Sequence, residues 1–237
     1  IIKKILQILF LLLRPNLKNI LVTGSCGFIG FHLSKALLEK GFLVIGLDNL
    51  NDYYDVNLKK NRLKILQGYK NFTFYLKDLM SLNEIGKFTP KISVAINLAA
   101  QAGIRLPERE NFKYEHSNIK GFCSFLEFCE KNDIEDILYA SSSSVYSGIK
   151  EIPYREDFKL SKPLSKYAET KIFNENEAKK FSEKHKRKVI GLRFFTVYGP
   201  WGRPDMAYYK FTMNALNNQE ITLFNDGKLS RDMTFID

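Results

Sequence analysis

A tyrosine and a lysine that can act together as a base lie four residues apart, at Tyr167 and Lys171. Four residues make about one turn of an α-helix, so the two side chains share one helix face. A tyrosine, with an ordinary pKa of about 10, is a poor base near neutral pH. We expect the Lys171 ammonium to favour the phenolate form of Tyr167 and so to make it a general base.

A glycine-rich turn predicts a site for a dinucleotide. An apolar run over residues 19–23 leads into Gly24, Gly27 and Gly30, and a helical pattern follows from residue 31 to a glycine at 41. A strand, a tight turn and a helix in this order bring backbone N–H groups to a pyrophosphate, and a Cβ at the glycines would block its approach.

An acidic residue after the next apolar run distinguishes between two cofactors. Residues 43–47 are apolar and end at Asp48. A carboxylate at the end of this strand accepts hydrogen bonds from the ribose hydroxyls and repels a 2′-phosphate. The sequence therefore favours NAD over NADP.

Further apolar runs, at residues 72–76, 94–98 and 137–140, also end in residues that suit a ligand. The intervening segments, such as residues 117–131, carry the helical period. This alternation predicts an α/β fold, a doubly wound parallel sheet of the Rossmann type with the start of a smaller C-terminal substrate lobe. Ligands bind beyond the carboxyl ends of such strands, where we expect Asp78, Leu79, Leu98, Ala99, Ala100, Gln101, Ser142, Ser143 and Ser144.

Taken together, these motifs resemble a known family. Residues 23–30, 98–100, 141–146, 167–171 and 192–195 are similar to the extended short-chain dehydrogenase/reductases of the NAD-dependent sugar-nucleotide epimerase/dehydratase group. The longer strings at residues 46–59, 99–105 and 193–206 resemble those of UDP-glucuronate 4-epimerases. The resemblance spans residues 19–237. It implies an isomerase that transiently oxidises C4 of a UDP-sugar, converting UDP-glucuronate to UDP-galacturonate, and it implies a homodimer.

The resemblance also implies roles for individual residues. Tyr167 takes the proton of the sugar 4-hydroxyl, Lys171 holds the tyrosine ionised and binds the nicotinamide ribose, and Ser142, with Ser143 and Ser144, steadies the sugar oxygen O4. Thr196 and Arg203 are candidates for binding the substrate carboxylate, since an arginine can bind it through two donors. Arg231 resembles the arginine that binds the nucleotide diphosphate. Further expected cofactor contacts are Phe28, Ile29, Asn49 and Phe195.

Ser144 favours epimerisation over related reactions. Relatives that dehydrate or decarboxylate the 4-keto sugar resemble one another in having a carboxylate just before a Val-Tyr pair, and here Ser144 precedes Val145 and Tyr146. Hydroxyls relay a proton but do not easily drive elimination. The alternatives that stay open are a UDP-glucose or UDP-N-acetylglucosamine 4-epimerase, a dehydratase or decarboxylase, and a non-catalytic NAD-binding protein. The last is disfavoured because the residues for catalysis are all present.

We expect three regions along the chain: an apolar and basic extension over residues 1–18, an NAD-binding domain over residues 19–198, and a partial substrate-binding region over residues 199–237. The uncharged apolar run at residues 5–13 is too short to cross a bilayer, which takes about 20 residues. We expect it to lie at an interface or to have no role, and membrane contact is not expected. Family members continue beyond the segment around Arg231, so we expect this chain to be a fragment that lacks activity by itself.

Composition adds few constraints on the location, partners and size of the fold. Three cysteines, at positions 26, 123 and 129, have no metal-ligand or redox spacing and suit a cytoplasmic protein. The net charge of +10 is spread over helices without a recognised nucleic-acid-binding module, so no nucleic-acid partner is expected. The 237 residues, 45% of them apolar, suffice for one α/β core and part of a second lobe.

Overall fold

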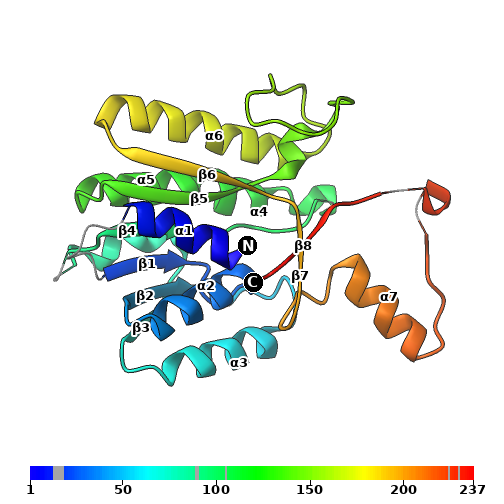
Figure 1. Cartoon of the computed structure of the whole chain (residues 1–237), viewed down its shortest axis with the longest axis horizontal. Helices are drawn as coiled ribbons and strands as arrows, with labels where there is room; N and C mark the ends of the chain where they lie inside the picture. Colours follow the sequence, from blue (N-terminus) through cyan, green and yellow to red (C-terminus); the bar gives the residue numbers. More distant parts are fainter. Residues whose placement is uncertain (13–18, 89–90, 105, 224, 229) are drawn as a thin grey trace.

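The apolar runs form a six-stranded parallel sheet in a computed structural model, which describes residues 1–12, 19–88, 91–104, 106–223, 225–228 and 230–237. The strand order is β3-β2-β1-β4-β5-β6 (Figure 1). Every residue of β1 and β4 is buried, because helices cover both faces of the sheet. The doubly wound fold expected from the sequence is confirmed. The strands are β1 Asn19–Thr23, β2 Leu43–Asp48, β3 Phe72–Leu76, β4 Val94–Asn97, β5 Asp136–Ser142 and β6 Lys188–Phe194.

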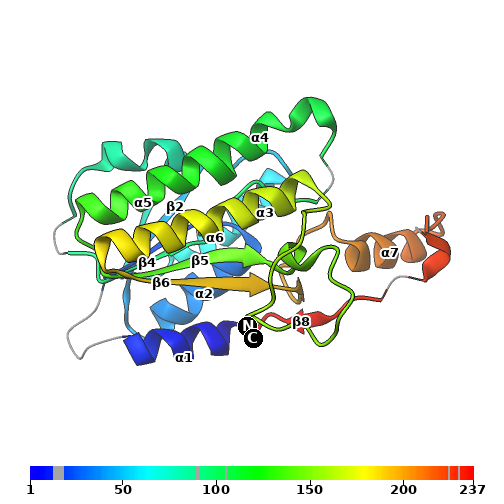
Figure 2. The same cartoon turned by 90° about the horizontal axis from the view of Figure 1, so that it is seen from above.

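Helices pack on the two faces of the sheet (Figure 2). Each face has its own cluster of buried apolar side chains. One face carries α2 (Phe28–Glu39) and α3 (Val56–Gln67), and the other carries α5 (Gly121–Lys131) and α6 (Lys166–His185). Helix α2 ends as its glycine predicts: Gly41 has a φ of +83°, and its N–H donates to the carbonyl of Leu38 at 3.0 Å. Short helical turns complete the connections: η1 Leu79–Ile85, η2 Glu108–Glu110, α4 Phe112–Tyr114, η3 Glu115–Lys120 and η4 Ser143–Tyr146.

The chain after the sheet forms a smaller unit. Strand β7 (Thr196–Tyr198) pairs in parallel with β8 (Met233–Phe235), and between them helix α7 (Ala207–Leu216) extends away from the sheet (Figure 1). A short turn, η5 (Asn225–Gly227), precedes β8. None of the residues of α7 is buried, although Phe211 and Leu216 are large and apolar. This region thus has little core of its own.

The apolar extension does not lie apart from the fold. Residues Ile2–Leu12 form helix α1, whose apolar side chains recur at helical intervals and are buried in the same cluster as β1, β4 and α2. The N–H of Ile2 also donates to the carbonyl of Ile236 at 3.0 Å, so α1 lies beside the end of β8. The remainder of the extension, residues 13–18, falls outside the described residues. No helix in the described parts of the chain is long and apolar enough to cross a membrane. The buried residues of α1 are Ile2, Ile5, Leu6 and Leu9.

Candidate active site

The glycine turn between β1 and α2 has the shape that a pyrophosphate site requires. A Cβ on Gly24 would lie 2.7 Å from the backbone N of Ala99, and one on Gly30 would lie 2.0 Å from the carbonyl oxygen of Gly24. The N-cap of α2 is Gly27, which offers no side chain to the first N–H groups of the helix. An uncapped helix N-terminus behind side-chain-free backbone fits the diphosphate of NAD. Phe28 is buried in the core, and Ile29 packs against the core but is partly exposed.

Asp48 lies directly beside this turn. One carboxylate oxygen accepts the N–H of Cys26 at 3.0 Å, and the other accepts the N–H of Leu50 at 2.8 Å. Burial raises the pKa of Asp48, and these two N–H groups together with the positive charge of Lys59 oppose the rise. Asp48 therefore supports the turn itself, in addition to standing at the strand end where a ribose is expected.

Asn49, which follows β2, and Asp78, which comes after β3, lie side by side. The Asn49 amide donates to Asp78 Oδ2 at 2.8 Å, and His116 Nε2 lies 3.0 Å from Asp78 Oδ1. Asp78 also caps η1 by accepting the N–H of Met80 at 2.9 Å. Leu79 is buried in the core. Sequence reasoning missed His116, which comes from the helical connection η3 and carries no local motif.

The end of β4 is fixed by an asparagine that no sequence motif indicates. Asn118 lies in η3, where the helix widens to a π-turn. Its side chain accepts the N–H of Gln101 at 2.7 Å and donates to the Gln101 carbonyl at 3.2 Å and to the hydroxyl of Thr170 at 3.1 Å. Asn118 thus joins the segment after β4 to α6. The expected contacts Leu98, Ala99 and Ala100 lie on this segment and are half-buried.

The serines and the tyrosine meet at the end of β5. Ser142 is the last residue of β5, and its hydroxyl accepts the N–H of Ser144 at 3.2 Å. Ser143 and Ser144 begin the turn η4. The Ser144 hydroxyl oxygen is buried and has no hydrogen-bond partner in the described residues. A buried hydroxyl without a partner is unfavourable unless a ligand takes up its hydrogen bond, so Ser144 is available to a substrate.

Tyr167 and Lys171 lie one turn apart near the start of α6, as their spacing predicts. The Lys171 Nζ is 5.7 Å from the centre of the Tyr167 ring, and it donates to the carbonyl of Ala140 at 2.9 Å. Burial lowers the pKa of Lys171 to about 8. Burial raises the pKa of Tyr167, while the positive charge of Arg203 and a hydrogen bond with Ser142 oppose this rise. Arg203 is therefore a second cation near the Tyr167 phenol, in addition to Lys171, whose effect on the phenolate stays a prediction.

Arg203 is held by an acidic neighbour that the sequence analysis did not single out. Its Nε donates to Asp205 Oδ1 at 3.0 Å, and its Nη2 donates to the other oxygen of the same carboxylate. Tyr53 donates to Asp205 Oδ2 at 3.3 Å. This ion pair engages one edge of the guanidinium and leaves Nη1 outside it. Thr196, the other expected carboxylate contact, begins β7 and is half-buried.

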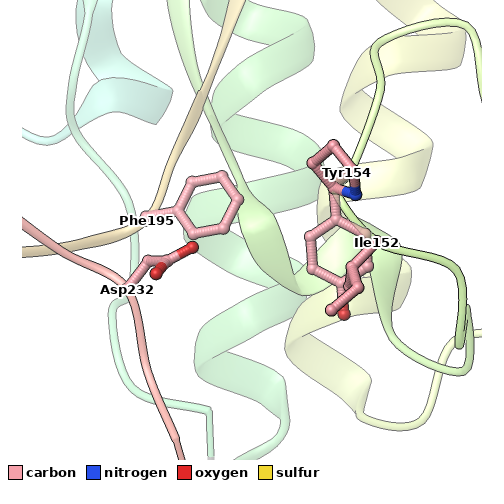
Figure 3. A pocket seen from close by; sticks show the side chains of 5 residues that line it. Ile152, Tyr154, Phe195 and Asp232 are labelled. Atoms are coloured by element: carbon pink, nitrogen blue, oxygen red, sulfur yellow. The ribbon is translucent and has the colours of Figure 1, made fainter.

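Two further predicted residues lie at the C-terminal unit. Phe195 lines a cavity of about 570 Å³ together with Ile152, Pro153, Tyr154 and Asp232. Figure 3 shows the Phe195 ring near the Asp232 carboxylate, across the cavity from Ile152 and Tyr154. Arg231 is exposed just before β8 and donates to the carbonyl of Ser230 at 3.2 Å. The guanidinium of Arg231 is thus accessible to an anion.

A partly buried ion pair supports the serine turn from behind. Arg193 on β6 binds Glu175 on α6 through two hydrogen bonds, of 2.9 and 2.8 Å, and Glu175 also accepts the hydroxyl of Ser141 at 2.6 Å. Arg193 donates to the Tyr146 hydroxyl at 2.8 Å as well. Arg193 stood within a motif in the sequence, but its partner Glu175 had no local signal.

Known proteins are similar to this chain in sequence. The model of the NAD dependent epimerase/dehydratase family matches residues 20–237. An uncharacterized protein of Methanocaldococcus jannaschii is 48% identical over 223 residues, which cover 92% of this chain and 68% of that protein. UDP-glucuronate 4-epimerase 2 of Arabidopsis thaliana is 44% identical over 225 residues, covering 92% of this chain and 52% of that protein.

A solved structure shows the same fold. UDP-glucuronic acid 4-epimerase from Bacillus cereus in complex with UDP-glucuronic acid and NAD aligns with a TM-score of 0.83 and 34% identity, over 92% of this chain and 69% of that one. This chain thus spans 52 to 69% of the length of these three relatives. The family resemblance, the Rossmann-type fold and the NAD dependence predicted from the sequence are confirmed. On the match over residues 20–237, the chain belongs to the NAD-dependent epimerase/dehydratase family.

Proposed function

We propose that this chain carries the NAD-binding and catalytic part of a 4-epimerase that converts UDP-glucuronate to UDP-galacturonate. The observation that carries the proposal is the meeting of Tyr167, Ser142 and Arg203, which lie on α6, β5 and the loop after β7. In this proposal Tyr167 is the proton acceptor and Arg203 is the cation that binds the substrate carboxylate. Relatives whose names state this activity support the substrate assignment.

The roles of the residues follow from their contacts. Tyr167 takes the proton of the sugar 4-hydroxyl and returns it when inversion is complete. The Arg203 charge and the Ser142 hydroxyl stabilise the phenolate against burial. Ser144, whose hydroxyl oxygen has no partner in the described residues, hydrogen-bonds O4 of the sugar. Lys171 fixes the end of β5 through the Ala140 carbonyl and places a positive charge next to the tyrosine ring.

The glycine turn, Asp48 and the segment 98–101 would hold NAD, and Lys171 would bind its nicotinamide ribose. The chemistry that bound NAD supplies is reversible hydride transfer at C4 of the sugar. Position 144 is a serine, so at this position the serine turn offers a hydroxyl for proton transfer at O4 in place of a carboxylate that could act as acid or base in elimination. Arg203 through Nη1, with Thr196, binds the substrate carboxylate, and Arg231 binds the diphosphate. Homodimer formation stays a prediction from the family resemblance, and a cytoplasmic location stays a prediction from the cysteine content.

The test is product analysis with the protein at its full natural length. UDP-glucuronate and UDP-glucose are incubated separately with the enzyme, and the products are identified by anion-exchange chromatography and proton NMR. We expect UDP-galacturonate from the first and little turnover of the second. A UDP-pentose or a 4-keto-6-deoxy sugar would instead show decarboxylation or dehydration, and preferred turnover of UDP-glucose would show a neutral-hexose epimerase.

A further inference from the structure

A fully buried arginine connects the glycine turn to the loop that carries Arg203. Arg62 lies on α3 and has no solvent exposure. Its Nη1 donates to the carbonyl of Cys26, inside the glycine turn, at 2.9 Å. Its Nη2 donates to the carbonyl of Trp201 at 2.6 Å. One planar guanidinium therefore links two segments that are far apart in the sequence.

The surroundings of Arg62 are costly for a cation. Besides the two carbonyls, its hydrogen-bond partners in the described residues are the hydroxyl of Tyr54 at 2.7 Å and the carbonyl of Gly202 at 3.5 Å. Its Nε is buried without a partner in that part of the chain. Burying a charge costs several kcal/mol, and the carbonyls together with the nearby Asp48 carboxylate offset only part of this cost. An apolar side chain would fill this space at a lower free-energy cost. The hydrogen bonds that Arg62 donates therefore indicate a role other than filling the core.

The loop that Arg62 holds is strained. Trp201 has a φ of +60°, which costs a residue other than glycine about 1–2 kcal/mol. The Trp201 ring packs against Phe31 of α2 at 5.7 Å, and His32 Nε2 lies 2.9 Å from the Pro200 carbonyl. A strained segment has a competing relaxed conformation and persists only where its surroundings hold it. The surroundings here are Arg62 and the first turns of α2.

We propose that Arg62 is a positioning residue that couples binding of NAD at the glycine turn to the conformation of residues 201–203. A ligand that restrains the backbone at Cys26 also restrains the guanidinium bonded to it, and through Trp201 it favours the placement of Arg203 next to Tyr167. By linkage, the loop in turn favours NAD binding by the same factor. This inference rests on the proposed function, because it takes the glycine turn to be the NAD site.

Trp201 is the single tryptophan of the chain and is 39% exposed, so its fluorescence reports on this loop alone. We would measure acrylamide quenching of the 237-residue chain with and without NAD⁺, and NAD⁺ binding separately by equilibrium dialysis. Bound NAD⁺ should lower the quenching constant roughly twofold, as expected when one of two packing states is selected. Arg62→Met should bind NAD⁺ more weakly and lose this response. Arg62→Lys, which keeps the charge but reaches fewer carbonyls, should retain part of it.

Lys60→Met is the matched control, because it removes one exposed positive charge from the same helix and should respond like the native chain. If Arg62→Met does not fold, hydrogen exchange of the Gly202 amide in the native chain tests the coupling instead. This amide donates to the Gly199 carbonyl at 3.1 Å, so its exchange reports on the conformation of the loop. NAD⁺ should slow its exchange. Binding of NAD⁺ without any change at Trp201 or Gly202 overturns the coupling alone. Absence of NAD⁺ binding overturns the proposed function as well.

Discussion

Replacement of Arg203 by alanine tests the substrate carboxylate most directly. Asp205 occupies Nε and Nη2 of the guanidinium, so Nη1 is the donor that the ion pair leaves for a second carboxylate. A hydrogen bond to a charged group contributes about 1.5–3 kcal/mol. At 1.4 kcal/mol per factor of ten, Arg203→Ala should weaken binding of UDP-glucuronate by about 10- to 150-fold. UDP-glucose has no carboxylate, and its affinity should fall less than about threefold.

The assay must separate binding from chemistry, because Arg203 also lowers the pKa of Tyr167. Loss of Arg203 raises that pKa, and turnover should fall for both nucleotide sugars. Dissociation constants are therefore measured by calorimetry on the NAD-loaded, full-length protein, apart from kcat. Asp205→Asn is the control, since it keeps Arg203 but removes a negative charge near the substrate, and UDP-glucuronate should bind at least as well. Equal losses of affinity for both sugars in Arg203→Ala would refute the assignment and place Arg203 at the diphosphate or in the loop structure.

Four further outcomes follow from the site. Tyr167→Phe should lower turnover about 10²-fold or more with NAD⁺ affinity unchanged, and near-native activity would exclude Tyr167 as the base. Gly30→Ala should abolish NAD⁺ binding and lower the melting temperature, because its Cβ would lie 2.0 Å from the Gly24 oxygen; a variant that binds NAD⁺ normally would contradict this packing. Ser144→Ala should leave the free energy of unfolding unchanged or raised, since the Ser144 hydroxyl has no partner among the described residues. Its turnover should nevertheless fall about 2- to 10-fold, and unaffected turnover argues against a contact with O4. Folding lowers the pKa of Lys171 from 10.5 to about 8, so between pH 8 and pH 10.5 the unfolded chain binds more protons than the folded chain. The free energy of unfolding should therefore rise with pH over this range, and Lys171→Met should lose that rise. Urea titrations at several pH values measure this.

The sequence alone predicted the parts of the fold that depend on local patterns. The apolar runs at residues 43–47, 72–76 and 94–98 became strands within one or two residues of their expected ends, because alternation and length are local properties of the chain. The glycine turn could also be predicted from the sequence, since only glycine tolerates the contacts found at Gly24 and Gly30. The spacing of Tyr167 and Lys171 gave their common face on α6, and the serines were expected where β5 ends.

Tertiary structure decided which side chains these elements bring together. The ion pair of Arg203 with Asp205 is local, but the hydroxyl of Tyr53 that completes it comes from 152 residues away. Arg62 meets Trp201 across 139 residues, and Asn118 meets Thr170 across 52. No periodicity or motif encodes such pairs, because they arise only when strands order themselves and loops converge at one edge of the sheet. The same holds for α1, whose apolar stripe was visible in the sequence but whose place in the core depends on the sheet face that it covers. It also holds for the electrostatics of Tyr167: spacing pointed to Lys171 as the neighbouring cation, while packing brought Arg203 near the phenol and directed the Lys171 ammonium to a carbonyl.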